Sequence, residues 1–99
     1  MTVPNPANSS MVRAGNLIDR TTYYRHDLLA AANPTVPKNP HAFAGAFDVP
    51  AMQTVAVQAQ TQMAVFFQSD GATFIDPDGS GSLFETPIVE LPETLNFLP

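Results

Sequence analysis

The sequence predicts an α/β fold of one domain, in which a short helix, a strand, a loop, a long helix and an extended arm follow one another. Apolar residues recur at helical spacing over residues 50–69, which indicates the long helix. Residues 21–24 combine threonine with tyrosine, which is typical of a strand. Ten prolines spread over both halves argue against a coiled coil or a helical bundle. Several short elements joined by stiff loops therefore agree best with the composition.

The first predicted element is a short helix. Residues 3–6 read Val-Pro-Asn-Pro and are expected to be non-helical, because each proline pushes the residue before it toward extended backbone. Residues 8–10, Asn-Ser-Ser, offer side chains that cap a helix N-terminus. Gly15 and Asn16 predict its end. The expected apolar stripe consists of Met11, Val12, Ala14 and Leu17.

A strand and a loop are predicted next. Residues 21–24 form the strand, which ends in the polar tip Arg25-His26-Asp27. Residues 28–32 are long enough for one helical turn. Residues 33–40 contain three prolines and read as a loop, which leads directly to His41.

The long helix over residues 50–69 has glutamines on its polar side. Asp48 offers an N-cap oxygen, Pro50 suits the first turn, and Gly71 stands where a left-handed C-terminal residue is wanted. Residues 72–75 are expected to add a short strand. The predicted apolar side of the helix, which we expect to pack rather than to bind a ligand, consists of Val55, Ala56, Ala59, Met63, Phe66 and Phe67.

A turn over residues 76–82 separates a predicted core segment, residues 1–75, from a C-terminal segment, residues 76–99. Alternating apolar positions over residues 83–89 predict that this segment continues as an edge strand or an extended arm. Asp76 and Asp78 begin a pattern that resembles a calcium-binding loop, whose oxygen ligands recur at alternate positions. Pro87 occupies the twelfth position, where such loops carry a bidentate glutamate. A plain Asp/Gly/Ser turn is the better interpretation.

The order of the elements, with Val3-Pro4 at one end and Asn39-Pro40-His41-Ala42-Phe43 before the long helix, resembles the end of an α/β-hydrolase. In that family an Asp-x-x-Val-Pro loop bears the catalytic acid, and a helix, the last parallel strand, the histidine loop and the final helix follow. The resemblance covers residues 3–71 and implies that this chain is the C-terminal part of the fold. In that register the acid would precede Met1. The G-x-S-x-G nucleophile motif is absent, since residues 79–82, Gly-Ser-Gly-Ser, have the wrong spacing.

The resemblance implies that His41 is the catalytic residue. An imidazole takes a proton from serine and returns it to the leaving group, provided that a loop presents it to the reacting atoms. His26 is the rival, because it follows the strand and has Asp27 beside it. Adjacent residues on an extended chain point to opposite faces, so Asp27 is poorly placed to orient His26. We therefore expect His26 to contact solvent or Tyr23.

Charge and composition bear on partners and cofactors. Four Lys+Arg against nine Asp+Glu give a net charge of -5 without a basic cluster, which argues against nucleic acid as a partner. No apolar run approaches the roughly 18 residues of a membrane span, and residues 1–10 lack the features of a signal peptide. The chain has no cysteine, and the triad chemistry implied by the resemblance requires no cofactor.

These observations lead to two hypotheses about function. In the first, the chain is part of a serine hydrolase that cleaves a small-molecule ester; it supplies the histidine but not the nucleophile or the acid, and it is inactive alone. Having lost its sheet, the isolated chain would self-associate through an uncovered helical stripe, Val55, Met63 and Phe66. In the second, it is an acidic non-enzymatic module that binds calcium or a protein through residues 76–83 and 88–97. A fragment without function of its own is the remaining interpretation.

Overall fold

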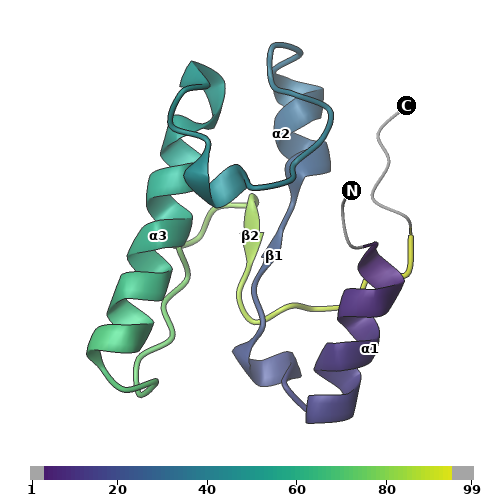
Figure 1. Ribbon diagram of the computed structural model, residues 1–99, viewed down its shortest axis with the longest axis vertical. Helices are drawn as coiled ribbons and strands as arrows, with labels where there is room; N and C mark the ends of the chain where they lie inside the picture. The colour runs from purple at the N-terminus through teal and green to yellow at the C-terminus, as the bar shows by residue number, and fades with distance from the viewer. Residues whose placement is uncertain (1–3, 95–99) are drawn as a thin grey trace.

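The computed structural model describes residues 4–94, and within them three α-helices surround a two-stranded antiparallel sheet (Figure 1). Short 3₁₀ turns, labelled η, join or extend these elements. In chain order the elements are α1 (Asn5–Gly15), η1 (Ile18–Arg20), β1 (Tyr23–Tyr24), α2 (His26–Ala32), η2 (Phe43–Gly45), η3 (Pro50–Met52), α3 (Gln53–Gln68) and β2 (Phe84–Glu85).

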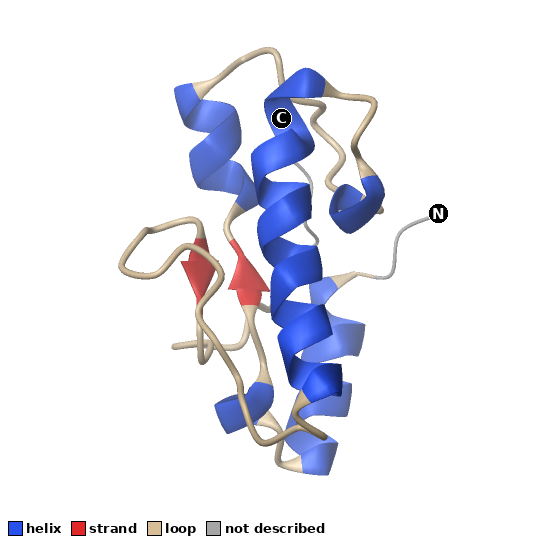
Figure 2. Ribbon diagram, turned by 90° about the vertical axis from the view of Figure 1, so that its left-hand side faces the viewer, coloured by secondary structure: helices blue, strands red, loops and turns tan. Residues whose placement is uncertain are grey.

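The sheet corrects the predicted fold class. β1 pairs antiparallel with β2, with Tyr23 opposite Glu85 and Tyr24 opposite Phe84. The C-terminal part of an α/β-hydrolase would place its last strand in a parallel sheet, so that prediction was wrong. After α3 the chain runs back beside that helix, and the C-terminal arm itself occupies the edge of β1 (Figure 1, Figure 2). A two-residue strand carries too little pattern to show which partner it pairs with, or in which direction.

α1 begins earlier than predicted. Pro4 is its N-cap, and Pro6 lies in the first turn, where the missing N–H would have no helical partner in any case. The expectation that residues 3–6 are non-helical was therefore wrong for Asn5 and Pro6. The helix ends at Gly15 as predicted, and Asn16 adopts left-handed backbone with φ 53°.

α3 confirms the predicted long helix. Its entry is the 3₁₀ turn η3, which begins at Pro50, and no side-chain hydrogen bond from Asp48 caps it. Beyond the C-terminus Gly71 has φ 77°, and its N–H donates to the carbonyl oxygen of Phe66 at 2.8 Å. Residues 72–75 form no strand.

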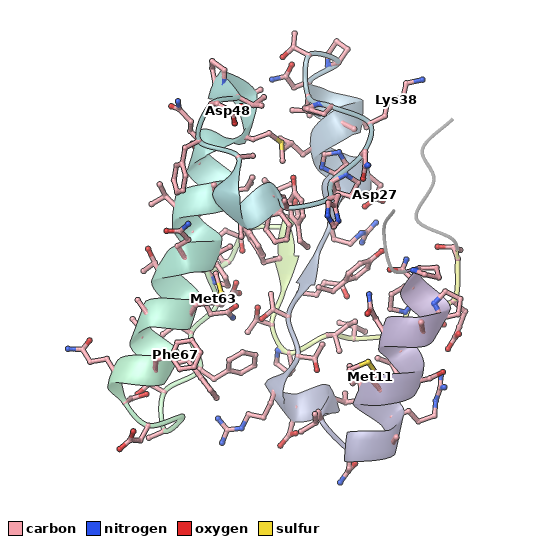
Figure 3. All side chains as sticks on the ribbon, viewed as in Figure 1. Met11, Asp27, Lys38, Asp48, Met63 and Phe67 are labelled. Carbon is pink, nitrogen blue, oxygen red and sulfur yellow. The ribbon has the colours of Figure 1, made fainter. Side chains whose placement is uncertain are left out.

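The core lies at the N-terminal half of α3, between this helix, the segment from η2 to η3, and the sheet. Its buried residues are Val36, Met52, Val55, Ala59 and Phe84. The prediction that Val55 belongs to an uncovered stripe was wrong, because only 2% of this residue is exposed. Farther along α3, Met63 and Phe67 are 43% and 74% exposed and lie on its lower half (Figure 3).

The C-terminal arm ties α1 to the rest of the molecule. The N–H of Ile88 donates to the carbonyl oxygen of Thr21 at 2.8 Å. The Ser9 hydroxyl donates to the carbonyl oxygen of Pro92 at 2.6 Å, and Arg13 forms an ion pair with Glu93. The arm thus runs from the sheet to α1 (Figure 1). Residues 95–97 of the predicted binding tail lie outside the described residues.

Candidate functional site

His41 lies on the loop between α2 and η2, and its side chain is exposed. Among residues 4–94, the imidazole makes no hydrogen bond or ion pair. It lines a pocket of about 320 Å³ together with Asp48. Apolar residues form much of the remaining wall: Pro37, Pro40, Phe43, Ala46, Val49 and Met52.

The backbone around His41 has a defined conformation. The N–H of His41 donates to Oδ1 of Asn39 at 3.0 Å, and the N–H of Phe43 donates to the carbonyl oxygen of Pro40 at 3.0 Å. Ala42 adopts left-handed backbone with φ 59°. Such backbone costs a residue with a Cβ roughly 1–3 kcal/mol, so it persists only where surrounding contacts enforce it.

His26 occupies a different environment, in which only 5% of the residue is exposed. A carbonyl oxygen can only accept, so the 2.6 Å contact between Nε2 and the Pro37 oxygen requires a proton on Nε2. In the neutral ring, Nδ1 then accepts the Tyr24 hydroxyl proton at 2.9 Å. Both nitrogens of His26 are thus engaged. Its partner is Tyr24, whereas the sequence suggested solvent or Tyr23.

Asp27 pairs with Arg25 and not with His26. Two hydrogen bonds, 2.7 and 2.9 Å long, join its carboxylate to the guanidinium group of Arg25, and these bonds hold the pKa of Asp27 below its ordinary value. Arg25 also contacts the carboxylate of Glu85 at 3.1 Å. Asp27 lies in the first turn of α2, away from Asp48, which precedes η3 (Figure 3).

Tyr24 is a site residue that the sequence did not reveal. Its ring stacks on Phe43, with centroids 4.3 Å apart and planes 25° apart, while its hydroxyl contacts His26. Burial raises the pKa of Tyr24 to about 12, so the hydroxyl stays protonated at neutral pH. Its place two residues before His26 was the available sequence signal.

Asp76 and Asp78 form the turn before β2. Oδ2 of Asp78 accepts the Leu83 N–H at 2.9 Å, whereas Oδ1 of each aspartate is buried and has no hydrogen-bond partner within residues 4–94. Burial raises the pKa of Asp76, and a hydrogen bond and the negative charge of Asp78 raise it further. Within the described part of the chain, no group of three or more His, Cys, Asp or Glu residues is arranged to hold a metal ion. The geometry therefore gives no support to the calcium hypothesis.

Comparison with protein-family models, with curated proteins and with solved structures finds no match to this chain. The resemblance to α/β-hydrolases stays a prediction. None of the helices in residues 4–94 is long and apolar enough to cross a membrane.

Proposed function

We propose that this chain contributes His41 as the general base and acid in the serine-dependent hydrolysis of a carboxylic ester. The serine nucleophile and the acid are assigned to polypeptide other than these 99 residues. The observation that carries the proposal is the exposed imidazole of His41, which has no partner among the described residues and stands on an ordered loop at an apolar pocket. His41 is exposed, whereas both ring nitrogens of His26 are engaged in hydrogen bonds.

The chemistry needs both nitrogens of such a ring. One accepts the proton of the serine hydroxyl while the serine oxygen attacks the ester carbonyl, and then gives that proton to the departing alcohol as the ester C–O bond breaks. The same nitrogen next takes a proton from water as the water oxygen attacks the acyl-enzyme, and gives that proton to the serine oxygen as the bond between serine and the acyl group breaks. The other nitrogen bonds to the acid, which fixes the tautomer. This arrangement recurs on unrelated folds, so it does not depend on an α/β-hydrolase sheet.

The pocket indicates the class of ester. Phe43, Val49 and Met52 give it apolar walls beside the imidazole, and a volume of about 320 Å³ suits a small substrate. An apolar acyl group therefore fits this wall better than a charged one. We propose a small neutral ester with a short acyl chain as the substrate.

The test uses the complete gene product, including any sequence encoded before Met1, with p-nitrophenyl butyrate as substrate. His41→Ala is expected to lower kcat by at least about a hundredfold, the usual contribution of a general base. Added imidazole should restore part of the lost rate. Gln68→Ala, at an exposed position of α3, serves as the control and should retain full activity. Unchanged turnover by His41→Ala, or a gene product without esterase activity, contradicts the proposal.

A further inference from the structure

Tyr24 and His26 contact the loop that carries His41 on both sides of that residue. His26 donates from Nε2 to the carbonyl oxygen of Pro37 at 2.6 Å, and the Tyr24 ring stacks on Phe43 at 4.3 Å. Pro37 precedes His41 by four residues, and Phe43 follows it by two. The loop is thus held before and after His41.

A hydrogen bond joins these two contacts into one unit. The hydroxyl of Tyr24 donates to Nδ1 of His26 at 2.9 Å. This bond favours the tautomer with its proton on Nε2, which is the proton that the bond to Pro37 requires. Only 5% of His26 is exposed, so water has little access to compete for either bond.

The backbone between Tyr24 and His26 is itself held by a hydrogen bond, and the loop that these residues contact includes a residue in an unfavourable backbone conformation. The N–H of Arg25, between the two residues, donates to the carbonyl oxygen of Leu83 at 2.8 Å and thereby extends the pairing of β1 with the C-terminal arm. At the other end, Ala42 has the left-handed φ of 59° next to His41. A residue with a Cβ keeps this backbone only when neighbouring contacts enforce it.

We propose that Tyr24 and His26 are positioning residues, which hold the loop so that His41 keeps its place at the pocket. This inference rests on the proposed role of His41 as general base. Proton transfer requires the base within hydrogen-bond reach of the nucleophile, so a displaced loop lowers kcat. Neither positioning residue lines the pocket, so KM changes little.

Tyr24→Phe tests the unit with least disturbance, because it removes the hydroxyl and keeps the ring. In the complete gene product it should lower kcat at least about tenfold while KM stays within about twofold. Tyr23→Phe is the matched control, since that ring lies 6.0 Å from the guanidinium carbon of Arg25 and has no bond to His26. His26→Gln keeps an amide donor for Pro37, so its kcat should exceed that of His26→Leu.

Nuclear magnetic resonance of the 99-residue chain gives a readout that does not need activity. The ring nitrogen shifts of His26 should show the Nε2–H tautomer, and Tyr24→Phe should lower the backbone order of residues 38–42. Unchanged order and unchanged kcat in Tyr24→Phe overturn the inference.

The two proposals fail in different ways. If His41→Ala keeps full turnover, the proposed function is wrong, and the order of the loop alone decides whether Tyr24 and His26 position His41. Loss of order in Tyr24→Phe but not in Tyr23→Phe then supports the positioning. If His41→Ala abolishes turnover and Tyr24→Phe keeps full kcat, the proposed function stands and the positioning role is wrong.

Discussion

The carboxyl group of Asp76 lies where ionisation is unfavourable, because burial and the neighbouring Asp78 both raise its pKa above 3.8. The folded chain therefore holds this proton more tightly than the unfolded chain does. As pH rises from 3.8 through the raised pKa, the unfolded state loses its proton first, so the free energy of unfolding falls. The side chain in Asp76→Asn does not ionise, so its stability does not fall in this way as pH rises. Its amide can also donate a hydrogen bond to Asp78.

Asp76→Asn should therefore be more stable than the wild type at pH 7, and the difference should shrink as pH falls below 3.8, where both states of the wild type are protonated. Urea denaturation at several pH values measures it. Asp48→Asn, at an exposed aspartate, is the control and should leave stability nearly unchanged. A lower stability of Asp76→Asn at pH 7 contradicts the prediction. Stabilisation of the wild type alone by added calcium would instead revive the calcium hypothesis.

Single residues also show how far sequence reasoning reaches at the candidate site. His41 was chosen because the order of the elements, with Asn39-Pro40-His41 on the loop before the long helix, resembles the end of an α/β-hydrolase. The link from Tyr24 through His26 to Pro37 was not found, because it ends on a backbone carbonyl oxygen, and every residue has one. A contact of that kind leaves no side-chain pattern in the sequence.

At the scale of the elements, β2 packs the C-terminal arm against the core. Only 3% of Phe84 is exposed, and its ring packs against Tyr24 with centroids 5.4 Å apart. Phe84→Ala should lower the free energy of unfolding by about 3–5 kcal/mol, the usual cost of removing a buried aromatic ring. Val89→Ala, at a position 83% exposed, is the matched control and should change it by less than about 0.5 kcal/mol.

Urea denaturation followed by circular dichroism gives both values. Exchange of the Arg25 N–H, which is bonded to Leu83, should also become faster in Phe84→Ala than in Val89→Ala. Equal stabilities of the two variants would mean that β2 does not anchor the arm.

The elements differ in how well the sequence predicted them. The sixteen residues of α3 repeat one apolar period several times, so its bounds were nearly right. β1 and β2 have two residues each and lie about sixty positions apart, so neither periodicity nor local turn chemistry could pair them. The predicted parallel sheet failed for this reason. Periodicity also could not show where the core ends along α3, because Met63 follows the same spacing as the buried Val55 and Ala59.

At the scale of the whole molecule, the core buries residues in the N-terminal half of α3, whereas Met63 and Phe67 in its C-terminal half are exposed. Met63 and Phe67 are four residues apart, so they share one face of the helix, and they are 43% and 74% exposed (Figure 3). A second copy of the chain offers the same face, and mutual burial would remove these side chains from water. We therefore expect the isolated chain to self-associate through this surface.

Replacing Met63 and Phe67 together by glutamate should weaken the association at least about a hundredfold, because each buried apolar side chain contributes about 1.5–3 kcal/mol. Sedimentation velocity over a range of protein concentrations measures the effect. Val57→Glu is the control, since Val57 is 54% exposed but lies about 120° around the helix from Met63. A wild-type chain that stays monomeric at all concentrations, or an equal loss of association in Val57→Glu, would show that this surface does not mediate contact between copies. Association that depends on Met63 and Phe67 would show that this face of α3 mediates contact between copies of the chain.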